Sequence, residues 1–329
     1  MTAGVAAAIR GWGMAVPARR VTNHDLALRV DTSDEWIVER TGIRERRVAD
    51  DGETTASLAI EAGASAIKAA DLSPADIGLC IVATCTPDQP LPPTGSFVQD
   101  GLGLGCGAFD LDAACSGFVY ALVVGSSMLT AGRLDAVLVI GSETLSRIAD
   151  PDDRSTCVLF GDGAGAVVLT PSDEPALLAW DLGSDGSAAG LLYVSAGGSR
   201  LPTSAATVAE GQHWLRMGGQ EVFRRAVRAI VDSASNTLEA AGVEVGEVDL
   251  FVPHQANLRI IEAAGSRLGI PADRTMVNID RYGNTSAASI PIALAEAADA
   301  GRLRPGSLVL LSGFGAGMSW ASALLRWAP

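Results

Sequence analysis

An internal repeat limits the folds open to this chain of 329 residues more than any other property of its sequence. Three pairs of segments match in the same order: 72–85 with 243–255, 115–125 with 287–297, and 136–143 with 307–314. Within them, three residue pairs recur at offsets of 173, 172 and 172 residues: Asp76 with Asp249, Leu122 with Leu294, and Ile140 with Ser312. This nearly constant offset indicates a duplicated α/β unit. We therefore predict two halves, 1–172 and 173–329, joined near 170–180.

The apolar runs of the repeat predict buried strands. Four runs are continuous rather than alternating: 79–85, 136–141, 248–253 and 307–312. Such runs are typical of strands covered on both faces, as in parallel or mixed sheets between helices. Helix-like segments with small residues, such as 54–70 and 219–242, suit close packing on a sheet. Together they predict a layered α/β/α architecture.

Composition and charge exclude several classes of protein. Hydrophobic residues form 48% of the chain, too many for a disordered protein. No apolar run reaches the roughly 18 residues of a membrane span. The net charge of −14, from 24 basic and 38 acidic residues, argues against nucleic-acid binding. Because Lys68 is the single lysine, any basic patch must consist of arginines.

The cysteines and the start of the chain point to a reducing compartment. The five cysteines form no CxxC pair: Cys80, Cys85, Cys106, Cys115 and Cys157. An odd, scattered set predicts free thiols. The first thirty residues lack the ordered segments of a signal peptide, so we expect a cytoplasmic protein. We expect no metal, because no His, Cys, Asp or Glu cluster has metal-site spacing.

Cys115 has the sequence context of a nucleophile. It lies in DLDAACSGFVYAL (110–122), where an extended segment runs into a helix that starts at or just after the cysteine. The positive end of the helix dipole favours thiolate, which matters because an ordinary cysteine titrates near about 8.5. A cysteine is more often only a small buried hydrophobe, but this junction favours function. The other four cysteines lack it, and we expect them to be structural.

Two polar residues of the second half are candidate partners. His254 follows a buried strand in 249–261, where sites form in α/β sheets. Asn284 lies in DRYGNTSAASIPIAL (280–294), the repeat counterpart of the Cys115 junction. A lone histidine is more often structural, and an asparagine can simply tolerate a left-handed turn. The repeat, however, puts Cys115 and Asn284 at equivalent ends of two related elements.

Three glycine-rich strings have different interpretations. GLGLGCG (101–107) mimics a dinucleotide loop but does not connect a strand to a helix, so we expect no nucleotide role. GDGAGAVVL (161–169) is expected to be a strand where backbones approach closely. GFGAG (313–317) follows a buried strand and can offer backbone N–H groups to an oxyanion.

Together, DLDAACSGF, VPHQANLRII, YGNTSAASIPIAL and SGFGAG closely resemble the β-ketoacyl-acyl carrier protein synthase III family. TSDEWIVERTGIRERR (32–47) and DPDDRSTCVLFGDGAGAVVL (150–169) extend the resemblance over essentially the whole chain. It implies a thiolase fold layered α/β/α/β/α, a homodimer, and a catalytic triad of Cys115, His254 and Asn284. The implied activity is transfer of an acyl group from acyl-CoA to Cys115, then decarboxylative condensation with malonyl-acyl carrier protein. Such a reaction starts fatty-acid or polyketide chains and uses acyl-CoA as substrate, with no cofactor.

The resemblance also implies binding residues. Trp36 and Arg154 would hold the CoA adenine between them, and Arg40 would meet the phosphates. Met217, Gly219, Phe223 and Asn257 would line the pantetheine tunnel, and Arg224, Arg259 and Arg267 would form the patch that binds the carrier protein. The backbone N–H groups of Cys115 and Ala316 would bind the oxyanion. Leu91 of the neighbouring subunit would close the acyl pocket.

Some departures and alternatives follow from the same comparison. Ala316 stands where glycine is usual, and a residue with a Cβ serves there only if the local φ suits it. Ser266 replaces a frequent lysine and Gln220 a frequent asparagine, which would thin the carrier patch. Two other functions stay open: acyl transfer without condensation, to a carrier protein, alcohol or amine, and a non-catalytic partner subunit. The retained Asn284 favours condensation, and the retained Cys115 argues against a non-catalytic subunit.

Overall fold

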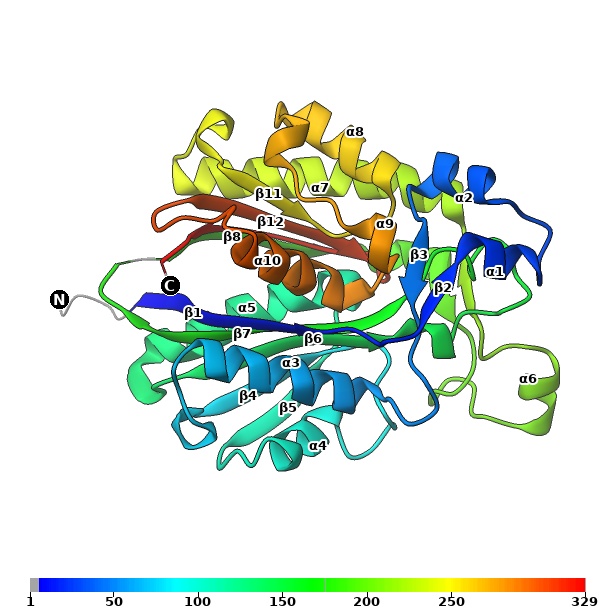
Figure 1. The fold of residues 1–329 in the computed structure, drawn as a ribbon, viewed down its shortest axis with the longest axis horizontal. Coiled ribbons are helices and arrows are strands. Elements are labelled where there is room, and N and C mark those ends of the chain that lie inside the picture. Colours follow the sequence, from blue (N-terminus) through cyan, green and yellow to red (C-terminus); the bar gives the residue numbers. More distant parts are fainter. Residues whose placement is uncertain (1–5, 175, 329) are drawn as a thin grey trace.

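The computed structural model describes residues 6–174 and 176–328, which form five layers (Figure 1). A five-stranded sheet and a four-stranded sheet enclose a central layer of helices, and further helices cover the outer face of each sheet. The predicted α/β/α/β/α layering is confirmed. Of the predicted segments, residues 1–5 and 329 at the outer limits and Pro175 in the join lie outside the described residues.

The first sheet has the strand order β1-β7-β6-β4-β5. Its strands are β1 (Ala6–Ala15), β4 (Leu79–Ala83), β5 (Gly107–Leu111), β6 (Val137–Thr144) and β7 (Asp162–Ser172). β4 runs parallel to β5 and β6, whereas β7 runs antiparallel to β6 and β1. Every residue of β4 and β6 is buried, as the continuous apolar runs predict. The sheet is therefore a mixed sheet covered on both faces.

The second sheet has the order β11-β12-β13-β8. Its strands are β8 (Leu177–Ser184), β11 (Leu250–Pro253), β12 (Leu308–Gly315) and β13 (Ser319–Arg326). β11 and β12 are parallel, and the other neighbours are antiparallel. Where the first sheet has β5, the second has only a single parallel bridge between Phe251 and Thr275.

Six helices make up the helical layers. The central layer is α5 (Gly117–Met128) and α10 (Ser289–Asp299), one outer layer is α3 (Thr55–Ala69) and α4 (Thr94–Gly101), and the other is α7 (Gly219–Ala241) and α8 (Leu258–Leu268). α3 begins after Thr54, whose side chain accepts a hydrogen bond from the Ser57 N–H, and α7 ends at Gly242 in the left-handed conformation. α7 buries residues at helical spacing, including Ala226, Ile230 and Ala234, against the second sheet.

Shorter elements gather mainly at the end of the layers away from the described termini (Figure 1). They are β2 (Arg20–Thr22), α1 (Asn23–Ala27), α2 (Asp34–Thr41), β3 (Glu45–Arg47), β9 (Leu192–Val194), α6 (Ala205–Ala209), β10 (Leu215–Met217) and α9 (Ile279–Tyr282). β2 pairs with β3, and β9 with β10, as two separate ribbons.

The two halves repeat the same succession of elements. A 3₁₀ turn leads to a buried parallel strand, a central helix and a second parallel strand, as η1 (Pro74–Asp76), β4, α5 and β6 in one half and η6 (Val245–Glu247), β11, α10 and β12 in the other. One predicted pairing is wrong by two residues: Asp76 corresponds to Glu247 rather than to Asp249. Each of these two acids accepts a hydrogen bond from the backbone N–H three residues earlier, which caps its turn.

The glycine-rich segment 161–169 forms most of β7, as predicted. A Cβ on Gly165 would lie 2.6 Å from the backbone of Pro291 and Ile292 in α10, so the central helix can approach the sheet only over glycine. GLGLGCG (101–107) lies between α4 and β5, in the order helix to strand, which differs from a dinucleotide loop.

One helical stretch, Ala114–Arg133, is long and apolar enough to cross a membrane by length and composition alone, although serine, glycine and threonine residues interrupt its apolar residues. In this structure 61% of its apolar window is buried inside the protein. Because the stretch contains α5, which packs between the two sheets, its apolar character is that of a core helix.

Candidate active site

Cys115 lies in a strained turn between β5 and α5. Ala114 has a φ of 46°, the left-handed region that residues with a Cβ rarely adopt, and a 3₁₀ turn, Ala114–Ser116, continues into the helix. The thiol therefore precedes the first turn of α5, as predicted. Cys115 is buried, with 8% of its surface exposed.

The second half repeats this turn before α10. Ser286, with a φ of 45°, takes the place of Ala114, and Ala287 takes the place of Cys115. Asn284 lies just before the turn, and its backbone is held by hydrogen bonds to the Leu159 carbonyl (2.8 Å) and from the Gly161 N–H (2.9 Å).

The orientation of the Asn284 side chain follows from its neighbours. The Ser286 N–H donates to Oδ1 of Asn284 at 2.9 Å. Because the amide oxygen is engaged by the backbone, the NH₂ group is the part that can donate to a substrate. Asn284 lines the cavity that also contains Cys115 and His254.

His254 follows the last residue of β11, as predicted. Its backbone N–H donates to the Ser312 carbonyl at 2.8 Å, and only 1% of its surface is exposed. Neither ring nitrogen has a hydrogen-bond partner among the described residues. The ring is therefore positioned by the backbone and by packing.

The three triad residues meet in one cavity of about 110 Å³. The four predicted tunnel residues line the same cavity: Met217, Gly219, Phe223 and Asn257. The histidine follows β11, the asparagine lies just before the turn that leads into α10, and the cysteine lies in the turn before α5. Residues from both halves thus converge on one site.

Burial dominates the electrostatics of this cavity. It raises the pKa of the Cys115 thiol to about 12 and lowers the pKa of His254 to about 3. The sequence argument invoked the α5 dipole alone, which favours thiolate. With these shifts both side chains are neutral at pH 7.

The turn after β12 contacts the nucleophile. A Cβ on Gly315 would lie 2.5 Å from the Cys115 backbone nitrogen, so only glycine allows this approach. Ala316 is not among the described residues with positive φ, whereas Gly317 has a φ of 130°. The backbone φ at position 316 therefore suits a residue with a Cβ, because the positive φ falls on the next residue, Gly317.

The predicted adenine residues lie together near α2. The Arg40 and Arg154 guanidinium carbons lie 4.7 and 4.9 Å from the centre of the Trp36 ring. A base between Trp36 and Arg154 requires about 7 Å, since each stacked contact takes about 3.5 Å. Arg154 must therefore move aside for an adenine, and its side chain is 46% exposed.

The predicted carrier-protein patch lies on α7 and α8. The Arg259 guanidinium carbon lies 5.9 Å from the centre of the Phe223 ring, so the patch borders the tunnel. Arg224 forms an ion pair with Glu221, which reduces its free charge. Arg259 and Arg267 are exposed and have no ion pair among the described residues.

Leu91 is 81% exposed and lies outside the triad cavity of its own chain. A second cavity, of about 570 Å³, opens beside the nucleophile turn and is lined by Ala113, Ala114 and Ala316. Leu91 does not line this cavity either, so within one chain it closes no acyl pocket.

Sequence reasoning missed Glu143, a fully buried carboxylate near the triad. It accepts hydrogen bonds from the backbone N–H groups of Cys85 (3.2 Å) and Ala287 (3.4 Å) and from the Thr86 hydroxyl (2.5 Å). Burial raises its pKa. The available signal was an acid inside the otherwise apolar strand of 136–143.

Comparisons with known proteins agree with this geometry. The family model for 3-oxoacyl-[acyl-carrier-protein (ACP)] synthase III matches residues 109–186, and the model for the C-terminal part of that enzyme matches residues 238–327. A β-ketoacyl-[acyl-carrier-protein] synthase III of Roseiflexus castenholzii is 55% identical over 324 residues, 98% of each chain.

Solved structures agree as well. A 3-oxoacyl-[acyl-carrier-protein] synthase III from Aquifex aeolicus matches with a TM-score of 0.90 and 46% identity, covering 98% of this chain and 100% of that one. The priming β-ketosynthase of the R1128 polyketide pathway matches with a TM-score of 0.92 and 38% identity, covering 100% and 98%. The predicted thiolase fold is confirmed, and the chain belongs to the 3-oxoacyl-[acyl-carrier-protein] synthase III family.

Proposed function

We propose that Cys115 carries the acyl group in the condensing reaction of this family, and that His254 and Asn284 stabilise the enolate formed from malonyl-acyl carrier protein. The chain is a condensing transferase by membership of the family. The residue roles rest on one observation: a thiol, an imidazole and an amide from three separate elements line a single buried cavity.

In the first half-reaction the Cys115 sulfur attacks the carbonyl carbon of acyl-CoA. The thiol proton passes to His254 as the sulfur–carbon bond forms, and it leaves with the CoA thiol as the old thioester bond breaks. Backbone N–H groups of Cys115 and Ala316 hold the tetrahedral oxyanion. Loss of one such donor typically costs about 2.7–4 kcal/mol of barrier.

In the second half-reaction malonyl-carrier protein loses CO₂, and its electron pair becomes the enolate of the remaining thioester. The enolate oxygen accepts hydrogen bonds from the neutral His254 ring and from the Asn284 NH₂ group. The carbanion then attacks the acyl-Cys115 thioester, and the Cys115 sulfur leaves as a thiolate that takes up one proton from water to restore the thiol. No charge has to be moved onto either donor, because both are neutral.

Intact-protein mass spectrometry with a panel of acyl-CoAs tests the first step. We expect one acyl mass on Cys115, none on the Cys115→Ala variant, and a preferred acyl length that identifies the substrate. Labelling at any other residue would refute the assignment.

Release of CO₂ separates condensation from simple acyl transfer. Asn284→Ala should leave acylation of Cys115 within a few-fold of wild type and lower CO₂ release from malonyl-carrier protein at least tenfold. Unchanged CO₂ release, with transfer of the acyl group to an alcohol, amine or carrier protein, would favour the non-condensing acyltransferase.

Two further roles belong to this proposal. Trp36→Ala should raise the KM for acyl-CoA but not for acyl-pantetheine, which lacks the adenine. A homodimer in which Leu91 closes the partner's acyl pocket predicts a dimer mass by sedimentation and a shift to shorter acyl chains in Leu91→Trp. A monomer with unchanged chain preference would exclude that pocket.

A further inference from the structure

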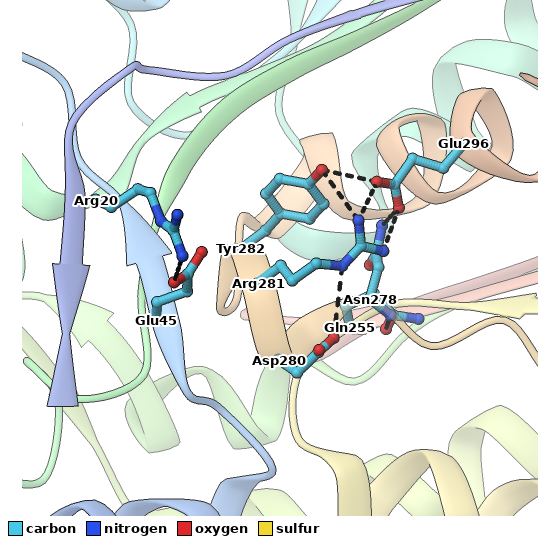
Figure 2. Close-up of polar contacts among 8 residues, drawn as sticks. All are labelled: Arg20, Glu45, Gln255, Asn278, Asp280, Arg281, Tyr282 and Glu296. Carbon is cyan, nitrogen blue, oxygen red and sulfur yellow. Dashed lines mark hydrogen bonds and ion pairs between the residues drawn. The ribbon is translucent and has the colours of Figure 1, made fainter.

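Glu296 of α10 is the centre of a polar network outside the triad cavity (Figure 2). Its Oε1 accepts hydrogen bonds from the Tyr282 hydroxyl (2.7 Å) and Arg281 Nη1 (2.7 Å). Its Oε2 accepts from Arg281 Nη2 (3.0 Å) and Asn278 Nδ2 (2.8 Å). Only 16% of the Glu296 side chain is exposed, so one carboxylate fixes three residues of the segment 278–282.

One arm of this network leads to His254. The Asn278 N–H donates to Oε1 of Gln255 at 3.0 Å. The Gln255 Nε2 group donates to the carbonyls of Pro253 (2.8 Å) and Met276 (3.1 Å). Gln255 and Asn278 are both buried, with 0% and 2% exposed, and Gln255 follows His254 directly. Because the His254 ring has no hydrogen bond of its own among the described residues, these contacts set its position through the backbone.

The other arm leads to Asn284. Arg281 and Tyr282 are the last residues of α9, and Gly283 follows with a φ of 67°. A Cβ on Gly283 would lie 2.9 Å from the Leu159 carbonyl, so the chain enters Asn284 through a turn that requires glycine. The hydrogen bonds from Arg281 and Tyr282 to Glu296 therefore fix the end of α9, from which the chain leads directly to Asn284.

The network is specific to the half that supplies the enolate donors. In the other central helix, α5, the residue equivalent to Glu296 at the 172-residue offset is Val124, a partly buried residue that packs against the core. The duplicated fold thus forms without a carboxylate at this position. This contrast indicates a role beyond holding the central helices together.

We propose that Glu296 is a positioning residue for decarboxylation: it sets the His254 and Asn284 donors at once and does not act on Cys115. The inference rests on the proposed function, because it assigns those two donors to the malonyl enolate. It predicts that the two half-reactions separate when Glu296 is changed.

The test compares Glu296→Gln with Glu239→Gln, an exposed glutamate of α7, as control. In Glu296→Gln one of the two carboxylate oxygens becomes an NH₂ group, which cannot accept a hydrogen bond from the donors it faces, and the negative charge that both arms share is lost. We expect CO₂ release from malonyl-carrier protein and condensation to fall about tenfold, acylation of Cys115 to stay within about twofold, and the control to match wild type. A second variant, Asn278→Ala, cuts only the His254 arm and should give a smaller fall in the same step.

The outcomes separate this inference from the proposed function. If Cys115 is acylated and Asn284→Ala suppresses CO₂ release, but Glu296→Gln and Asn278→Ala release CO₂ at the wild-type rate, the positioning role is wrong and the proposed function stands. Equal falls in acylation and CO₂ release would also overturn it, since they mark a general structural role. If wild type is not acylated, or Asn284→Ala retains full CO₂ release, the proposed function fails and this inference fails with it. Should Glu296→Gln not fold, Asn278→Ala alone decides.

Discussion

The turn that carries Cys115 and the turn that carries Ala287 are copies with different chemistry. Each begins with a left-handed residue, Ala114 or Ser286, at φ values of 46° and 45°. Each also packs over a glycine of the opposite half: Gly313 of β12 lies under Cys115, and Gly141 of β6 lies under Ala287. The duplication has therefore preserved a strained backbone in both places.

The difference lies two residues further along each strand. After Gly313, Gly315 brings no side chain to the Cys115 nitrogen, whose N–H we propose as an oxyanion donor. After Gly141, Glu143 places its carboxylate 3.4 Å from the Ala287 nitrogen. In the proposed mechanism the Cys115 turn binds the oxyanion of a substrate, whereas the Ala287 turn already binds a carboxylate of its own protein. Under that proposal, single side chains on a shared backbone decide which of the two turns is catalytic.

Moving the thiol from one turn to the other is the severest test of this comparison. In the double variant Cys115→Ala with Ala287→Cys, we expect no acyl adduct on the new thiol by intact mass. The N–H there is engaged by Glu143, and position 287 is fully buried. An adduct at position 287 would show that the second turn can still bind an oxyanion, and the comparison would fail.

A side chain at Gly315, beside the Cys115 turn, should lower the rate of acylation by a smaller factor than moving the thiol does. Gly315→Ala places a Cβ 2.5 Å from the Cys115 nitrogen and 2.9 Å from its Cβ, so backbone must shift and the N–H donor is displaced. We expect acylation to slow by about 10²–10³-fold, the usual cost of one oxyanion donor. Gly105→Ala, where a Cβ meets nothing within 4 Å, is the matched control. Acylation at the wild-type rate in Gly315→Ala would exclude the Cys115 N–H as a donor.

Burial and the α5 dipole shift the pKa of the Cys115 thiol in opposite directions, and its alkylation shows which effect is larger. A thiol with a pKa of about 12 is protonated across the physiological range, so its thiolate fraction rises tenfold for each pH unit. We expect alkylation of Cys115 by iodoacetamide to rise about tenfold per unit from pH 6 to 9 without a plateau. The rate is measured on the Cys115 peptide by mass spectrometry, with Cys115→Ala as background. A plateau below pH 8 would mean that the α5 dipole outweighs burial.

The fold, and the placement of Cys115, His254 and Asn284 in one cavity, could be predicted from the sequence because both follow from the pattern of the repeated elements. Continuous apolar runs predicted β4, β6, β11 and β12 to within a few residues at their ends, and the 172-residue offset predicted the duplication. The paired turns and the strand end then located Cys115, His254 and Asn284. A tertiary contact leaves no such pattern in the sequence. Glu143 and Ala287 are 144 residues apart, and neither segment has a feature that predicts its contact with the other.

The pairing of Asp76 with Asp249 shows the limit of residue matching. The match paired two identical residues. In the structure the equivalent of Asp76 is Glu247, which makes the same capping hydrogen bond. The charge state of Cys115 was equally out of reach, because the thiol pKa depends on how completely both halves enclose it.

The outer helical layers of the two halves differ in their basic residues. From this difference we derive the smallest of the predicted effects, a change in KM. α3, outside the first sheet, has Lys68 as its one basic residue, whereas α7 and α8 outside the second carry five arginines, among them the predicted patch of Arg224, Arg259 and Arg267. Arg259 borders the tunnel through Phe223, so an acidic carrier protein bound there could pass its pantetheine inward.

Arg259→Glu should therefore raise the KM for malonyl-carrier protein by about 5–20-fold and leave the KM for acyl-CoA within twofold, with the difference shrinking as salt is added. Arg133→Glu, an exposed charge reversal five residues beyond the end of α5, should change neither constant. Equal increases for both substrates would place Arg259 at the tunnel mouth that all substrates share, and docking would then have to be assigned to a surface other than α8.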